Sequence, residues 1–171
     1  MLIQSERLII RNTVLEDSAA LYREVFSDSE VVQHTFGRAI HSLSAAEEFI
    51  QQHCNFSGPF GLATLVERNS GEIVGLAGVI ESHYLNTLDY EFGFILGQRF
   101  QGRGYATEIG RAQINYIEQS LNATRVIALA SPDNRASIHT IEKLGLTYMT
   151  TLCAGARGDR AVYSAALNAH H

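Results

Sequence analysis

The stretch Gln101-Gly102-Arg103-Gly104-Tyr105-Ala106-Thr107-Glu108 lies between a strand-like run that ends at Leu96 and a helix-like run that begins near residue 106. Glycines at positions 102 and 104 let the backbone approach a ligand closely, because they carry no Cβ. The helix behind them presents unpaired N–H groups and a partial positive charge at its first turn. The segment therefore predicts a binding site for a phosphate or pyrophosphate group.

Length and composition indicate an ordinary globular protein. The chain has 171 residues, of which 46% are apolar and only two are proline, which predicts one domain, assigned to residues 1–169. The formal charge of −5, without a run of Lys or Arg, argues against a nucleic-acid partner. The longest apolar run, residues 73–80, is far too short to span a bilayer. We therefore expect a cytoplasmic protein with no membrane partner.

The cysteines and histidines predict no metal site. Cys54 and Cys153 lie far apart, and neither has a second Cys or a His at ligand spacing. The same spacing gives no sign of a disulfide framework.

Periodicity and turn signals divide the chain before the glycine loop into a strand, two helices and three further strands. Thr13 with Glu16, and Ser44 with Glu47, are spaced as capping boxes, and each box would open a helix. The expected strands cover residues 7–12, 60–67, 72–82 and 89–96. Short connections between the last three predict antiparallel neighbours.

After the loop, the pattern predicts a long helix to about residue 121, a strand at 125–130, and a second helix that Asn134 opens and Gly145 closes. Two strands follow, at 147–152 and 161–167. The order predicts an α+β fold with a mixed sheet flanked by helices. The sheet should be antiparallel at first and locally parallel where the glycine-loop helix crosses over.

Four segments in this order carry a resemblance to a known family: Ser5 to Arg11 followed by Glu16-Asp17; Gly71-Glu72-Ile73-Val74-Gly75; Asp89 to Leu96 with Gln101 to Glu108; and Asn134-Arg135-Ala136-Ser137 with Glu142 to Leu146. Together they resemble the GNAT acetyltransferases, and in particular the branch of ribosomal-protein serine and alanine N-acetyltransferases. The resemblance covers nearly the whole chain. It implies acetyl-CoA as cofactor and transfer of its acetyl group to a primary amine, either a protein N-terminus or a small amine, by direct attack.

The resemblance also implies where the cofactor lies. Its pyrophosphate would bind the backbone N–H groups from Gly102 to Thr107, with charge-assisted contacts from Arg103 and also Arg99. The implied pyrophosphate loop therefore comprises Gln101, Gly102, Arg103, Gly104, Tyr105, Ala106 and Thr107.

The pantetheine arm would bond to main-chain groups of Phe94 and Leu96, in a gap where two strands splay apart, and the Phe94 N–H would polarise the thioester carbonyl. Gly93 indicates either a bulge there or close packing. Asn134 is either a helix cap alone or a cap that also contacts the arm.

Acetyl transfer to an amine needs a group that removes the amine's proton, and Glu91 is the first candidate for this base. A carboxylate that only orients the substrate is the alternative, with Tyr90 or His83 as other bases. Ser137 shares a helical stripe with inward-facing residues and is the candidate acid for the leaving thiolate. Its alternative is a bond back to the helix.

The chain departs from the family pattern at two places. Ile141 stands where many GNAT enzymes carry a tyrosine as the acid, and the final hairpin reads Cys153-Ala154-Gly155-Ala156 where some members of the branch place a carboxylate. The acceptor site is expected in the segment 29–42, with its residues His34, Phe36 and His41, and in the final hairpin.

Two other functions remain open on the sequence. A dinucleotide-binding oxidoreductase would share the first two glycines of Gly-x-Gly-x-x-Gly, but Thr107 takes the third place. A non-catalytic acyl-CoA-binding module would keep the cofactor loop and lose turnover. Either a monomer or a homodimer is compatible with the sequence.

Overall fold

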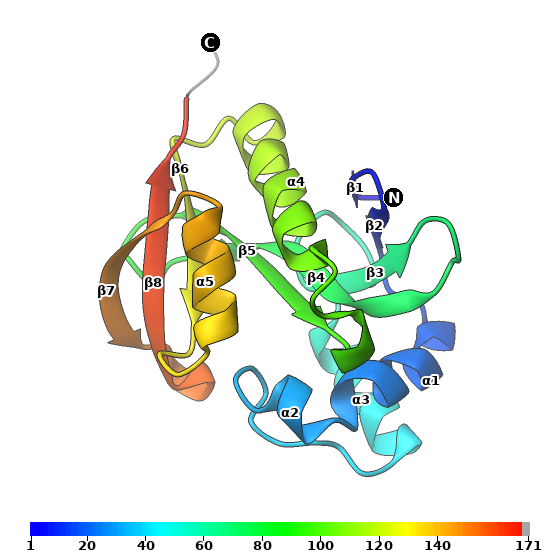
Figure 1. The fold of residues 1–171 in the computed structure, drawn as a ribbon. Helices are drawn as coiled ribbons and strands as arrows, with labels where there is room; N and C mark the ends of the chain where they lie inside the picture. The colour runs from blue at the N-terminus through cyan, green and yellow to red at the C-terminus, as the bar shows by residue number, and fades with distance from the viewer. Residues whose placement is uncertain (169–171) are drawn as a thin grey trace.

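The computed structural model describes residues 1–168, and a mixed sheet of eight strands runs through them in the order β1-β2-β3-β4-β5-β6-β8-β7 (Figure 1). Only β5 and β6 are parallel, and every other neighbouring pair is antiparallel. This confirms the expected α+β class, while the last residue of the expected domain, 169, lies outside the described residues. The strands are β1 Ile3–Gln4, β2 Leu8–Arg11, β3 Ala63–Glu67, β4 Ile73–Ser82, β5 Asp89–Leu96, β6 Arg125–Ala130, β7 Thr147–Cys153 and β8 Asp159–Ala166.

The helices lie on both faces of the sheet. Figure 1 shows α4 over the middle of the sheet and α5 beside it, while α1, α2 and α3 lie together at the bottom of the view. The first expected helix is a succession of a 3-10 turn, α1 and a π-helical turn, and α2 is a short helix in a segment expected to be a loop. The helices are α1 Ser18–Leu21, α2 Ser29–Val32, α3 Leu43–His53, α4 Tyr105–Ser120 and α5 Arg135–Lys143, and the additional turns are Leu15–Asp17, Tyr22–Phe26, Gln98–Phe100 and Gly155–Arg157.

Strand β5 separates two hydrophobic clusters, because its side chains alternate between the two faces. Phe92 and Leu96 belong to the larger cluster, which includes residues of α4 and α5. Ile95 belongs to the second cluster, with Phe26 and Ile50 from the helices on the other face. Each large apolar side chain buried in this way stabilises the fold by roughly 1.5–3 kcal/mol. The middle of β5 is therefore held firmly from both sides.

The expected helix starts were wrong by one residue at the first helix and by two at the second. At the first, the Val14 N–H donates to the carboxylate of Asp17 (2.9 Å), so Asp17 and not Glu16 closes the turn. At the second, the Ala45 N–H donates to the Ser42 hydroxyl (3.1 Å), two residues before the expected Ser44 cap. Several Ser, Thr and acidic residues crowd each helix start, and tertiary partners decide which one serves as the cap.

The strands β5 and β6 part after a single register pair, Glu91 with Ile127, whereas β5 stays paired with β4 along its whole length. Of the two alternatives for Gly93, the bulge is not observed, since the β4–β5 register is continuous there. A Cβ at Gly93 would lie 3.4 Å from the Leu62 side chain, which fits the alternative of close packing. The gap therefore comes from the divergence of β5 and β6.

Candidate active site

The main-chain groups of Phe94 and Leu96 face this gap. The Gly97 N–H donates to the Val74 carbonyl (2.9 Å), which marks position 97 as bonded to β4. Bonded positions alternate along an antiparallel ladder, so the N–H and C=O groups of residues 94 and 96 are directed away from β4. The Leu96 carbonyl accepts a bond from the Gln101 amide (3.0 Å), in agreement with this direction.

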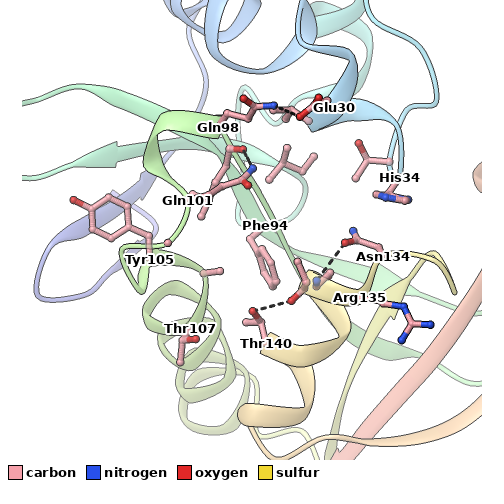
Figure 2. A pocket seen from close by; sticks show the side chains of 18 of the residues that line it. Glu30, His34, Phe94, Gln98, Gln101, Tyr105, Thr107, Asn134, Arg135 and Thr140 are labelled. Atoms are coloured by element: carbon pink, nitrogen blue, oxygen red, sulfur yellow. Dashed lines mark hydrogen bonds between the residues drawn. The ribbon is translucent and has the colours of Figure 1, made fainter.

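A cavity of about 660 Å³ lies beside the gap. Figure 2 shows Phe94 between Gln101 and Tyr105 on one side and Asn134 on the other. The wall of this cavity brings together β5, the glycine loop and the start of α5, which are far apart in the sequence. Of the expected cofactor residues, those lining the cavity are Phe94, Leu96, Gln101, Gly102, Gly104, Tyr105, Ala106, Thr107 and Asn134.

The glycine loop has two residues in the left-handed region of backbone conformation. Gly102 and Gly104 have φ values of +77° and +81°, a left-handed conformation that side chains with a Cβ rarely adopt. Gly104 is the residue before α4, and the N–H groups of the first helical turn have no partner within the helix. Because residues 105–107 also line the cavity, these donors and the helix dipole lie at its wall. The arrangement fits a pyrophosphate.

The two arginines expected at the pyrophosphate lie elsewhere. The guanidinium of Arg103 lies over the Phe100 ring (5.4 Å to the centroid), and Arg103 is absent from the residues that line the cavity. Arg99 donates to the buried carboxylate of Glu24 (2.9 Å), so it serves an ion pair. The loop therefore presents backbone donors more than side-chain charge.

Side chains around the start of α4 fix the loop against the first strands. Arg7 donates to the Glu108 carboxylate (2.7 Å) and to the Arg103 carbonyl (3.0 Å). Burial alone would raise the pKa of Glu108, but bonds from the Ser5 hydroxyl and from Arg7 bring it below its ordinary value. The Tyr105 hydroxyl donates to Glu67 on β3. These contacts hold the glycine loop in one place.

Asn134 caps α5, since its side-chain oxygen accepts from the Ser137 N–H (3.3 Å). Both residues line the first cavity and also a second one of about 440 Å³. Thr140 bonds back to the Ala136 carbonyl (3.2 Å), but no such bond is recorded for the Ser137 hydroxyl within residues 1–168. The alternative of a back-bonded Ser137 is therefore not observed, and the hydroxyl is free to meet a ligand.

The second cavity continues from the first across β5. Its wall includes Glu91 from β5, residues of the segment after α2, and two arginines of the final hairpin. The residues common to both cavities are His34, Thr35, Phe94, Ile95, Asn134 and Ser137. Two ligands, one in each cavity, would therefore meet beside Phe94.

Glu91 is 2% exposed and is paired with a residue that the sequence analysis did not identify. The Arg157 guanidinium donates to both carboxylate oxygens of Glu91, at 2.8 and 3.2 Å. Burial lowers the pKa of Arg157, but its hydrogen bonds to Glu91 and the attraction of that carboxylate together outweigh burial, so the net pKa is raised. Arg157 also lies over the Tyr84 ring (5.7 Å), so its charge is held in place. The pair lies on the wall of the second cavity.

The other expected acceptor-side residues divide into two groups. His34 and Phe36 line the second cavity, whereas His41 and His83 are exposed and line neither cavity. Tyr90 stacks on Phe60 and is also absent from both walls.

Arg157, Arg160 and His53 are functional candidates that the sequence did not reveal. Arg157 lies 66 positions from Glu91 in the chain. An isolated arginine in a glycine-containing turn gives no signal of its own, so only the fold identifies these contacts.

Within residues 1–168, no cluster of three or more His, Cys, Asp or Glu side chains is arranged to hold a metal ion. In the same part of the chain, no helix combines the length and the apolar character needed to cross a membrane.

Comparison with known proteins gives consistent matches. Residues 7–147 match the family described as the acetyltransferase (GNAT) domain. The uncharacterized N-acetyltransferase p20 of Bacillus licheniformis is 29% identical over 83% of this chain and 80% of that protein. The spermidine N(1)-acetyltransferase of Escherichia coli K12 is 29% identical over 45% of this chain and 41% of that protein.

Solved structures agree with the fold. A GNAT-family acetyltransferase from Bacillus anthracis superposes with a TM-score of 0.80 at 23% identity, over 97% of this chain and 98% of the other. The Microcin C7 self-immunity acetyltransferase MccE, solved with acetyl-CoA and AMP, superposes with a TM-score of 0.75 at 20% identity, over 95% and 93%.

The family match removes the dinucleotide-binding alternative, which would also need several parallel crossovers where this sheet has one parallel pair. The fold, the gap between β5 and β6, and the glycine loop at the start of α4 all agree with that match. The chain therefore belongs to the GNAT family and is an acetyl-CoA-dependent N-acetyltransferase.

Proposed function

We propose that the protein acetylates a primary amine by direct attack, with acetyl-CoA in the first cavity and the amine in the second. The observation that carries this proposal is the set of residues that the two cavities share, around Phe94. Two substrates that meet at one point need no enzyme-bound acyl group. Neither Cys54 nor Cys153 lines either cavity, which supports a route without a cysteine intermediate.

In this proposal the cofactor is held mostly by backbone groups. The N–H groups from Gly102 to Thr107 would hold the pyrophosphate, and the main chain of Phe94 and Leu96 would bond the peptide-like arm. When bound, acetyl-CoA supplies an activated acetyl group as a thioester. The Phe94 N–H, directed into the gap, would stabilise negative charge on the carbonyl oxygen. Asn134 would contact the arm from the opposite wall.

We assign the amine's proton to Glu91, taken up directly or through water. A protonated amine cannot attack, so a proton acceptor near the meeting point is needed. Arg157 binds both carboxylate oxygens of Glu91 and so holds this group in place at the wall of the second cavity. Ser137 would give its hydroxyl proton to the departing thiolate, since Ile141 cannot.

The acceptor class is proposed at the level of a primary amine, small or at a protein N-terminus. The spermidine acetyltransferases among the relatives support a small amine. We also place the protein in the cytoplasm, because both cysteines are free and Cys153 is exposed, as in a reducing compartment.

The test is a thiol-release assay with acetyl-CoA and a panel of primary amines and peptides, with the acetylated product identified by mass spectrometry. We expect amine-dependent thiol release in equal amount to the acetylated product. Tight acetyl-CoA binding with no thiol release for any amine would instead establish the non-catalytic binding module.

A further inference from the structure

Arg160 is a buried cation in the second cavity without a carboxylate partner. Its side chain is 7% exposed and lines the cavity wall. Its guanidinium donates only to backbone carbonyls, those of Asp159 (2.9 Å), His34 (3.1 Å) and Thr35 (3.4 Å). Among residues 1–168, no carboxylate lies within ion-pair distance of it. All three hydrogen bonds come from the two Nη atoms of Arg160, and none comes from its Nε–H.

The cavity therefore carries an excess of positive charge. Its wall holds two guanidiniums, Arg157 and Arg160, against one carboxylate, Glu91. Both oxygens of Glu91 already accept from Arg157. Burial lowers the pKa of Arg160 and repulsion from Arg157 lowers it further, and these two effects together exceed the opposite effect of the Glu91 charge, which is not paired directly with Arg160. The other ionisable side chains on the wall are His34, His53 and Tyr84, and none of them is a carboxylate.

A buried charge without a partner is unfavourable, so such a site favours a ligand that supplies the opposite charge. A carboxylate or phosphate matches the planar fork of a guanidinium. A second ammonium group, as in a polyamine, would instead add like charge to the same cavity. The wall of the second cavity thus favours an amine that also carries an acid group over an amine that carries a second ammonium group.

We propose that the acceptor is an amine that also bears an acid group, a carboxylate or a phosphate, and that Arg160 binds this acid group while the amine reaches the gap beside Phe94. The inference rests on the proposed function and narrows its acceptor class. It makes Arg160 the residue that determines specificity, and it separates this chain from the spermidine acetyltransferases that it resembles in part.

The test compares matched amines of the same chain length. One set is 4-aminobutanoate, butylamine and 1,4-diaminobutane, repeated for chains of two to six carbons, with α-amino acids and aminoalkyl phosphates added. The first measurement is kcat/KM for thiol release by the wild-type protein. We expect an acid-bearing amine to exceed its neutral counterpart by about tenfold or more. The phosphate and carboxylate arms show which acid group is preferred.

The variants Arg160→Gln and Arg160→Lys separate charge recognition from support of the fold. Arg160 also ties β8 to the segment at 34–35, so its loss could lower all rates together. We therefore measure the ratio of kcat/KM for acid and neutral amines, which a purely structural role leaves unchanged. Glutamine should bring the ratio close to one, and lysine, which keeps the charge, should retain much of it.

A wild-type measurement avoids dependence on folding of the variants. Butanoate, an acid without an amine, should compete with the acceptor, and 1-butanol should not. Preference for diamines, or an acid-to-neutral ratio unchanged in Arg160→Gln, would overturn the inference and leave the transferase intact. A loss of acetyl-CoA affinity alone in Arg160→Gln would show that Arg160 serves the cofactor. Thiol release with no amine at all would count against the proposed function itself.

Discussion

Glu91 and Asp89 are two buried carboxylates on the same strand, and each is paired with an arginine. Asp89 accepts from Arg125 at 2.6 and 2.8 Å, much as Glu91 accepts from Arg157. Only Glu91 lines a cavity. The two pairs thus share their burial and their ion-pair geometry and differ in access to a substrate.

Glu91→Gln should lower kcat by about 10²-fold or more with little change in acetyl-CoA affinity, because the base is lost while the shape is kept. The residual rate should rise at high pH, where more of the amine is already neutral. Asp89→Asn is the matched control, since it breaks an equivalent buried pair away from the cavities. Equal losses of kcat in the two variants would show that Glu91 acts only through the fold.

Ser137→Ala should slow turnover only a few-fold, because water can protonate a thiolate of this kind. Thr140→Val is the control on the same helix, since it removes a cavity-lining hydroxyl that is already bonded to Ala136. Steady-state rates and acetyl-CoA affinities of both variants decide the role. If Ser137→Ala weakens the cofactor and leaves kcat unchanged, the hydroxyl is a binding group.

At the scale of elements, the β4–β5 ladder positions the cofactor strand. A Cβ on Gly75 would lie 1.9 Å from the Ile95 carbonyl oxygen and 3.1 Å from the Leu96 Cα, both of them backbone atoms. Any side chain there must push β5 away from β4 at the end that borders the first cavity. The glycine is thus required by the close approach of two strands.

Gly75→Ala should lower the free energy of unfolding by about 1–3 kcal/mol, the usual cost of overpacking, and should also weaken acetyl-CoA binding. Gly93→Ala is the control on the same ladder, because its Cβ would lie 3.4 Å from the Leu62 side chain and 3.8 Å from the Gly78 carbonyl oxygen, with no backbone clash. Urea denaturation measures the free energy of unfolding of both variants, and titration calorimetry measures their affinity for acetyl-CoA. A Gly75→Ala protein as stable as Gly93→Ala would contradict the role assigned to this contact.

The sequence could predict where several strands and helices begin and end. Strands β5 and β6 begin and end where branched and aromatic runs met turn signals, and α4 begins within one residue of its expected start. Local patterns determine such features. The helix caps were misplaced because several adjacent residues could serve, and Asp17 was selected by its bonds to Arg11 and Thr64.

Contacts across the fold were beyond local reasoning. The sequence identified Glu91 as a candidate, but it could not show that a hairpin arginine binds both of its oxygens. The contact of Arg103 with the neighbouring Phe100 ring could not be predicted for the same reason, and its role at the pyrophosphate stays a prediction.

At the scale of the molecule, Asp17 joins three segments. Its buried carboxylate accepts from Arg11 on β2, from the Val14 N–H and from Thr64 on β3. Burial alone would raise the pKa of Asp17, but these bonds lower it below the ordinary value of 3.8. A depressed pKa in the folded state contributes stability that is complete above the unfolded pKa and is lost as pH falls through the folded value.

Asp17→Asn should therefore destabilise the fold at pH 7 by about 3–5 kcal/mol, because Arg11 and the surrounding donors lose a buried charge partner. Its unfolding free energy should also fall less steeply than that of the wild type below about pH 4. Glu16→Gln, an exposed neighbouring acid, is the control and should match the wild type. Denaturation curves at several pH values measure these free energies. If the unfolding free energy of Asp17→Asn falls as steeply with acid as that of the wild type, the role assigned to Asp17 is refuted.

The mechanism depends on acetyl-CoA binding at the glycine loop and the gap beside β5, and titration calorimetry measures this binding without dependence on turnover. The wild type should bind acetyl-CoA and show no measurable binding of NAD. Gly104→Val should weaken acetyl-CoA by about tenfold or more, because a branched side chain obstructs the approach of the pyrophosphate to the backbone. Gly71→Val carries the same backbone strain, with φ of +74°, in a turn outside both cavities, and should bind normally. Acetyl-CoA affinity that is equal in the folded Gly104→Val and Gly71→Val proteins, or tight binding of NAD, would contradict the account.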